Sequence, residues 1–94
     1  MDKSRRFASV WDAIEDTAAE AENMKLRSAL MLAIREHVKP KGWTHAEAAQ
    51  RLSSTQQLVA DLMRASIDLF GLDALVKMAT SAGLKVEMRV HAEP

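Results

Sequence analysis

The sequence predicts one mainly α-helical domain of four to five helices, followed by a short C-terminal β-strand. Apolar residues recur at helical spacing in several segments, and helix start and stop signals separate these segments. The last apolar residues instead alternate with charged ones, which is typical of a strand. A chain of 94 residues is long enough for one domain, and an apolar content of 48% is typical of a folded globular protein.

Composition excludes several classes of protein. The chain has no cysteine, which excludes a disulfide framework and thiolate-ligated zinc. No segment approaches the roughly 18 apolar residues of a membrane span, and the N-terminus is too polar for a signal peptide. We therefore expect a cytoplasmic protein that does not bind membranes. Net charge is zero, but residues 25–51 carry six cationic residues against two acidic ones. This positive segment either faces phosphates or forms an ordinary solvated helix surface.

Residues 1–17 are predicted to form an N-terminal arm or a short helix, since Phe7, Val10, Trp11 and Ile14 have helical spacing. Residues 18–83 form the predicted helical domain, and its longest helix runs over 18–38. One face of that helix is expected to pack inward and the opposite face to stay in solvent. The inward face comprises Leu26, Leu30, Ala33, Ile34 and Val38. The solvent face comprises Lys25, Ser28, Arg35 and Lys39.

The middle of the chain predicts two helices joined by a very short connection. Residues 44–52 form the first, because Thr44 and Glu47 make a capping box in which each side chain binds a backbone N–H of the other residue. The serine pair at 53–54 gives a tight turn, and residues 55–64 form the second helix.

Residues 84–94 are predicted to form a strand and tail after a helix over 72–82, which ends at a left-handed Gly83. A single strand is not stable alone, so it needs a partner. The partner could be an N-terminal segment or the same strand of a second copy, and we favour the second copy because residues 1–17 fit a helix better. The predicted dimer interface comprises Leu84, Val86, Met88 and Val90.

The paired helices THAEAAQRL and TQQLVADLMR fit a helix-turn-helix. Ala49 is small where the helices cross, and Val59 and Leu62 can wedge the pair apart at a fixed angle. In this motif the N-terminal turn of the second helix enters the major groove of DNA. Glutamines there can read adenine, or they are the exposed first turn of a surface helix. The predicted DNA-binding residues are Thr44, His45, Arg51, Thr55, Gln56, Gln57 and Arg64.

A resemblance extends beyond this motif. The segments VWDAIED, EAENMKLRSALMLAIREHVKPKGWT and IDLFGLDALVKMATSAGLKVEMRV resemble Xre-family domains that act as HigA-like antitoxins, over roughly residues 8–90. The resemblance implies a lambda-repressor-like fold. It also implies a homodimer that binds operator DNA, represses its own operon and neutralises a partner toxin.

The sequence departs from that family on the face directed at DNA. The family usually has arginine at the position of Leu58 and serine at that of Ala60. Arginine reads guanine with two hydrogen bonds, whereas leucine can touch only a thymine methyl group or a sugar. Alanine likewise removes a hydrogen bond to phosphate or base. The family also usually has glutamine at His45, left-handed glycine at Ser53, glycine-lysine at Ala65-Ser66 and serine at Gly71.

Two functions remain in competition. The first is a DNA-binding transcriptional regulator, an antitoxin that binds double-stranded operator DNA. The second is a helix-turn-helix-fold module for protein interaction or dimerisation, with weak or lost sequence-specific DNA binding. Leu58 and Ala60 favour the second, and the positive segment favours the first. Neither catalytic residues, a cofactor nor a metal is expected, because the histidines at 37, 45 and 91 lack ligand spacing and no nucleophile motif occurs.

Overall fold

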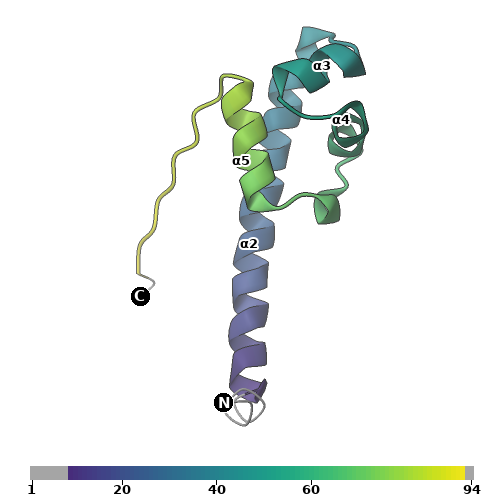
Figure 1. Ribbon diagram of the computed structural model, residues 1–94. Helices are drawn as coiled ribbons and strands as arrows, with labels where there is room; N and C mark the ends of the chain where they lie inside the picture. Colours follow the sequence, from purple (N-terminus) through teal and green to yellow (C-terminus); the bar gives the residue numbers. More distant parts are fainter. Residues whose placement is uncertain (1–8, 93–94) are drawn as a thin grey trace.

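The computed structural model describes residues 9–92, with side chains from residue 17 onward (Figure 1). The described part is mainly helical, as predicted, and contains four α-helices and two short 3-10 helices. In chain order these are α2 (Ser9–Val38), η1 (Lys39–Lys41), α3 (His45–Arg51), α4 (Gln56–Met63), η2 (Ile67–Leu69) and α5 (Leu72–Ser81).

Helix α2 is the long axis of the molecule, and the other elements pack along its C-terminal half (Figure 1). It has 30 residues and begins at Ser9, so it is longer than the predicted helix over 18–38. Neither glycine nor proline interrupts it, and Pro40 and left-handed Gly42 follow its end. Phe7 lies outside the described residues, as do the side chains of the other three apolar residues predicted to dock the N-terminal segment.

The core lies between the C-terminal half of α2 and the three short α-helices. Ile34 and Val38 are buried as predicted. Leu26 is 45% exposed and Ala33 is also exposed, which corrects the predicted inward face of α2. The apolar face of α2 therefore extends beyond the part that the other helices cover. The buried apolar residues are Met31, Ile34, Val38, Ala48, Ala49, Leu52, Val59, Leu62, Phe70, Leu75, Met78 and Ala79.

Two arginines of α2 bind backbone carbonyls at the end of α4 and in the segment that leads from α4 to α5. Arg35, predicted in solvent, is half-buried, and its Nη2 donates to the carbonyl of Met63 at 3.0 Å. The Nη1 of Arg27 donates to the carbonyls of Ile67 at 3.1 Å and Phe70 at 3.2 Å. Met63 is the last residue of α4, where carbonyls have no donor within the helix, so Arg35 supplies one.

Three helices end in the same left-handed turn. Ser53 (φ 54°), Ala65 (φ 60°) and Gly83 (φ 89°) follow α3, α4 and α5, respectively, which confirms the left-handed positions predicted at Ser53 and Gly83. After each of them, the next N–H bonds back to a carbonyl five residues earlier, at 2.8 Å for Ser54, 3.0 Å for Ser66 and 2.9 Å for Leu84. This is the Schellman pattern, in which glycine carries the smallest steric penalty.

The predicted C-terminal β-strand is wrong for the described chain. Residues 84–92 are extended, but no strand forms within residues 9–92. The physical reason is that an extended segment becomes a strand only when a neighbour binds its backbone, and no described segment pairs with it. Leu84 packs on the core, whereas Val86, Met88 and Val90 are 42%, 66% and 85% exposed.

We expect Ala65→Gly to stabilise the protein, because it removes the steric penalty of Cβ at φ 60° and breaks no side-chain hydrogen bond. The free energy of unfolding should rise by about 1 kcal/mol in urea denaturation followed by circular dichroism. The control is Ala74→Gly, at an exposed position inside α5, which should lose about 1 kcal/mol. Equal losses for both variants would contradict the assigned backbone strain.

Candidate nucleic-acid interface

Helix α3 begins with the predicted capping box. The Thr44 Oγ1 accepts a hydrogen bond from the backbone N–H of Glu47 at 3.1 Å, and the Glu47 Oε1 accepts from the N–H of Thr44 at 2.9 Å. The opposite face of the helix buries Ala48 and Ala49 in the core. The start of α3 is therefore set by local hydrogen bonds and its orientation by packing.

Helix α4 is held to the core by one face and presents its first turn outward. The Thr55 Oγ1 accepts from the backbone N–H of Leu58 at 3.1 Å and caps the helix. Val59 and Leu62 are almost fully buried, as expected for residues that pack the helix pair against the core. The predicted DNA-binding residues of the first turn, Thr55, Gln56 and Gln57, are exposed.

Leu58 and Ala60, which depart from the Xre-like pattern on the face directed at DNA, are only half-buried. Leu58 also packs against the core cluster. Part of each side chain therefore belongs to the interior and part remains at the surface beside the first turn of α4. An apolar side chain there offers van der Waals contact but no hydrogen bond to a base.

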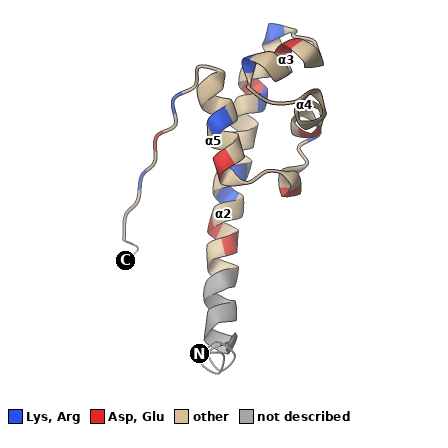
Figure 2. Cartoon of the chain, viewed as in Figure 1, with Lys and Arg blue, Asp and Glu red and all other residues tan. Residues whose placement is uncertain are grey.

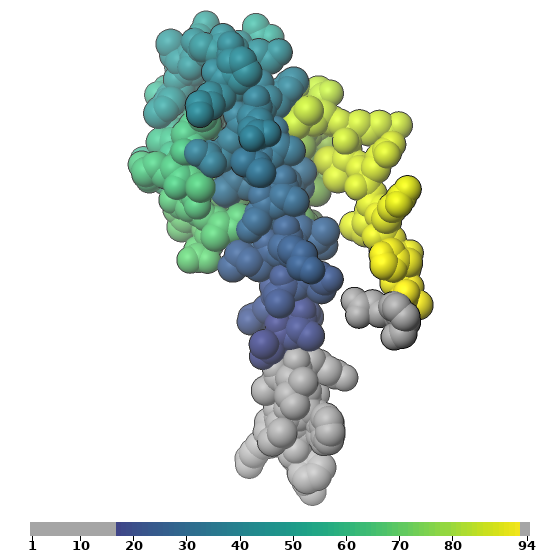
Figure 3. Space-filling view, turned by 180° about the vertical axis from the view of Figure 1, so that it is seen from behind, coloured from purple at the N-terminus to yellow at the C-terminus, as the bar shows by residue number. Residues whose placement is uncertain are grey.

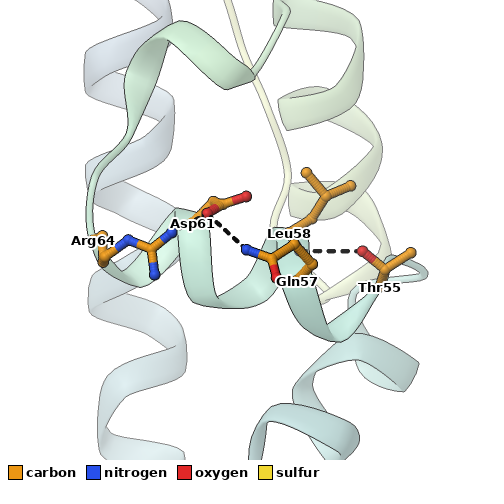
Figure 4. A network of polar contacts seen from close by, with 5 residues as sticks. All are labelled: Thr55, Gln57, Leu58, Asp61 and Arg64. Atoms are coloured by element: carbon orange, nitrogen blue, oxygen red, sulfur yellow. Dashed lines mark hydrogen bonds and ion pairs between the residues drawn. The ribbon is translucent and has the colours of Figure 1, made fainter.

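A buried carboxylate joins two of the predicted DNA-binding residues (Figure 4). The Gln57 Nε2 donates to the Asp61 Oδ1 at 3.2 Å, and the Arg64 guanidinium donates to the same oxygen. Asp61 is 5% exposed, whereas the side chain of Arg64 is 61% exposed. Asp61 is not among the residues predicted from the sequence. Its spacing, four residues after Gln57 and three before Arg64, was the available signal.

A second group of polar residues surrounds Trp43 at the start of α3. The Arg51 guanidinium carbon lies 5.2 Å from the centroid of the Trp43 ring, within the range of a cation–π interaction. Lys39 and His45 line a hollow of about 130 Å³ beside the same tryptophan. Figure 2 shows basic residues on α3 and at the neighbouring end of α2. The structure thus gathers His45 and Arg51 near Lys39, and exposed Thr44 directly precedes His45 in the chain.

The positive segment over 25–51 does not form one surface. Arg27 and Arg35 bind backbone carbonyls of the fold, and the Lys25 Nζ lies 3.6 Å from the Glu22 carboxylate. Of the six cationic residues, Lys39, Lys41 and Arg51 belong to the α3 end of the molecule. The positive charge next to the paired helices is smaller than the sequence count indicates.

The three histidines lie on separate elements. A ring nitrogen of His37 is 3.2 Å from the carbonyl oxygen of Ala82, His45 begins α3, and His91 lies in the tail. Among the residues that the structure describes, no three His, Cys, Asp or Glu side chains lie together in a way that could hold a metal ion. In the same part of the chain, no helix combines the length and the apolar composition needed to cross a bilayer.

Comparison with known families identifies the fold family of the paired helices. A family model described as a helix-turn-helix domain matches residues 13–91, which includes α3, α4 and most of the tail. No curated protein matches the sequence. The matched range covers well over half of the chain, and the seven predicted DNA-binding residues lie on its two central helices or at their caps.

We expect Arg27→Ala to destabilise the protein, because two partly buried carbonyls would lose a charged donor. The free energy of unfolding should fall by about 1–2 kcal/mol in urea denaturation. The matched control is Lys25→Ala, which removes an exposed ion pair and should change stability by less than about 0.5 kcal/mol. Equal effects would mean that Arg27 is a surface cation and not part of the fold.

Proposed function

The chain belongs to the helix-turn-helix domain family, and we propose that it is a DNA-binding transcriptional regulator. The observation that carries the proposal is the exposed first turn of α4 over residues 55–57. Val59 and Leu62 anchor the other face of this helix, so the turn is presented by a rigid support. In a helix-turn-helix, this turn meets base edges while the preceding helix crosses the phosphate backbone.

The side chains of this turn have the chemistry for both kinds of contact. Gln56 and Gln57 carry amides that can bind the adenine edge in the major groove. The Thr55 oxygen accepts the capping hydrogen bond, so its O–H hydrogen stays available to a phosphate. On the α3 side, His45 and Arg51 would add donors to the phosphate backbone.

Within this role, we propose an Xre-type antitoxin that represses its own operon and neutralises a partner toxin. The support is the resemblance of three long segments of the sequence to HigA-like antitoxins. The proposed role is not catalytic and uses no cofactor. The cytoplasmic location expected from the sequence stays part of the proposal, because a regulator shares a compartment with its DNA.

One observation favours the alternative, a protein-interaction module on the same fold. The helix pair over residues 44–64 carries two cationic and two acidic residues, and Arg64 is already bound to Asp61. Affinity for any DNA sequence comes mainly from neutralised phosphates, so this pair has little charge to attract DNA on its own. A homodimer would compensate by presenting two copies of the motif to one operator.

We propose that the protein is a homodimer joined through its tail. An apolar groove of about 370 Å³ separates the tail from α2 and α5. Figure 3 shows the extended tail standing away from α2. The tail of a second copy would cover this apolar surface and supply the backbone partner that the segment lacks. Apolar residues of the groove include Leu26, Leu30, Leu72, Val76, Leu84, Val86 and Met88.

Charge predicts the register of such an antiparallel pair. If the two-fold axis passes through Val86 or Met88, each Glu87 lies opposite a Lys85 or an Arg89 of the second copy. An axis through Glu87 would instead place like charges opposite each other, which is destabilising. The paired tails should therefore be centred on an apolar residue.

The proposed function is tested by binding of the purified protein to its own upstream DNA and to a scrambled duplex, over a series of salt concentrations. A regulator should prefer the upstream fragment, and its affinity should fall steeply with salt because counterions are released. Equal or absent binding to the two duplexes would favour the protein-interaction module.

The double variant Gln56→Ala, Gln57→Ala should lose preference for the upstream fragment. The loss should be about tenfold or more, since each two-bond contact to adenine discriminates strongly. The dependence of affinity on salt should stay unchanged, because no phosphate contact is removed. An equal fall in affinity for the scrambled duplex would argue against base reading by these residues.

Val86→Asp should convert the dimer to a monomer in sedimentation velocity, because it places a charge in the apolar contact between tails. The matched control is Leu69→Asp, which introduces the same charge at a 58% exposed leucine on η2, away from the groove. The control should remain dimeric. A dimer that survives Val86→Asp would contradict the tail interface.

A further inference from the structure

Asp61 is the buried charged residue of the described chain, and its side chain binds Gln57 on α4 and Arg64 directly after that helix. A carboxylate removed from water is costly unless it is paired and hydrogen-bonded. Asp61 meets this requirement with Gln57, one turn earlier, and Arg64, almost one turn later (Figure 4). The contact therefore constrains two exposed side chains that the proposed function places near DNA.

The contact to Asp61 decides how the Gln57 amide is turned. An ionised carboxylate only accepts hydrogen bonds, so it binds the NH₂ group and not the oxygen of the amide. The Nε2 lies 3.2 Å from the Asp61 Oδ1. One hydrogen of the NH₂ group is used there, and the second hydrogen and Oε1 remain. That combination of one donor and one acceptor matches the N7 and N6 groups of adenine.

We propose that Asp61 is a specificity-determining positioning residue, which orients Gln57 so that α4 prefers adenine over guanine. This inference rests on the proposed function. Guanine presents two acceptors in the major groove, N7 and O6, so the oxygen of the oriented amide would face an acceptor. Asp61 itself need not touch DNA. It acts through the orientation of the Gln57 amide.

The same carboxylate also reduces the attraction of α4 for phosphates. Arg64 is the cationic residue that follows α4, and its charge is offset by Asp61 three residues earlier. With less attraction for DNA of any sequence, the base contact contributes a larger share of the discrimination between sites. Loss of the Asp61 charge should therefore have two opposite effects, weaker base preference and stronger binding to random DNA.

The test is Asp61→Asn, with Asp68→Asn as the control that makes the same charge change at an exposed position on η2. Affinities are measured for the upstream duplex, for duplexes with single A·T to G·C exchanges, and for a scrambled duplex.

Wild type should lose about tenfold in affinity when one particular A·T pair is exchanged, and Asp61→Asn should lose that discrimination. Asp61→Asn should also bind scrambled DNA more tightly, with a salt dependence steeper by about one phosphate contact. Discrimination at every pair equal to wild type would overturn the proposal and leave the proposed function standing.

Gln57→Met provides a second variant, because it changes an exposed side chain and leaves the buried carboxylate in place. It should lose the same adenine preference, and adding Asp61→Asn to it should reduce that preference no further. If Asp61 were purely structural, Asp61→Asn would instead weaken binding to all duplexes alike and keep the adenine preference of wild type. Retained adenine preference in Gln57→Met overturns the proposal even if Asp61→Asn fails to fold.

A readout without DNA separates this inference from the proposed function. The NMR signals of the Gln57 side-chain NH₂ in the free protein should shift between wild type and Asp61→Asn, whereas those of exposed Gln56 should not. Unchanged Gln57 signals would overturn the positioning role. Shifted signals with equal wild-type affinity for all duplexes would overturn the adenine preference together with the proposed function.

Discussion

Hydrogen bonds from two arginines of α2 join the long helix to the end of α4 and to the segment before α5. Arg35 binds the end of α4, and Arg27 binds the segment that leads from α4 to α5. Buried Ile34 and Val38 lie on the same half of α2. Carbonyls at a helix end can be bonded by a side chain in only a narrow range of positions. Helix α4 is therefore held by its end as well as by its buried face.

The turn between α3 and α4 adds a second constraint, because it fixes their crossing through one left-handed residue. Ser53 takes this conformation without the freedom of glycine, and Ala65 does the same after α4. In each case the left-handed conformation costs about 1–2 kcal/mol of steric strain. Burial of apolar side chains such as Leu52 and Leu62 in the core offsets this strain. Tertiary packing here overrides local backbone preference.

The distribution of charge gives the paired helices little net attraction for DNA, so binding by the proposed regulator would depend mainly on the placement of its side chains. Two of the cationic residues of the positive segment serve the fold, and Arg64 is offset by Asp61. The basic residues around Trp43 remain for phosphate contact in the proposed regulator. The regulator and the protein-interaction module would use the same fold. They differ in whether the exposed turn of α4 meets DNA or another protein.

The sequence by itself determined the features that depend on neighbouring residues. The capping box of Thr44 and Glu47, the two short helices and the left-handed positions at Ser53 and Gly83 were all predicted correctly. Their hydrogen bonds join residues three to five positions apart, so a local pattern contains all the information. The exposure of the seven predicted DNA-binding residues also agrees with their polar character.

Only the tertiary structure decided which polar residues serve the core and which apolar residues stay outside it. Arg27 and Arg35 bind carbonyls 28 to 43 residues away, so they look like surface cations in the sequence. Asp61 becomes buried because the body of the protein covers its side of α4. The tail shows the opposite case, since its alternating pattern specifies a strand face but cannot supply the neighbour that a strand requires. Contacts between distant segments depend on how the helices pack, and that packing is not contained in any local pattern of residues.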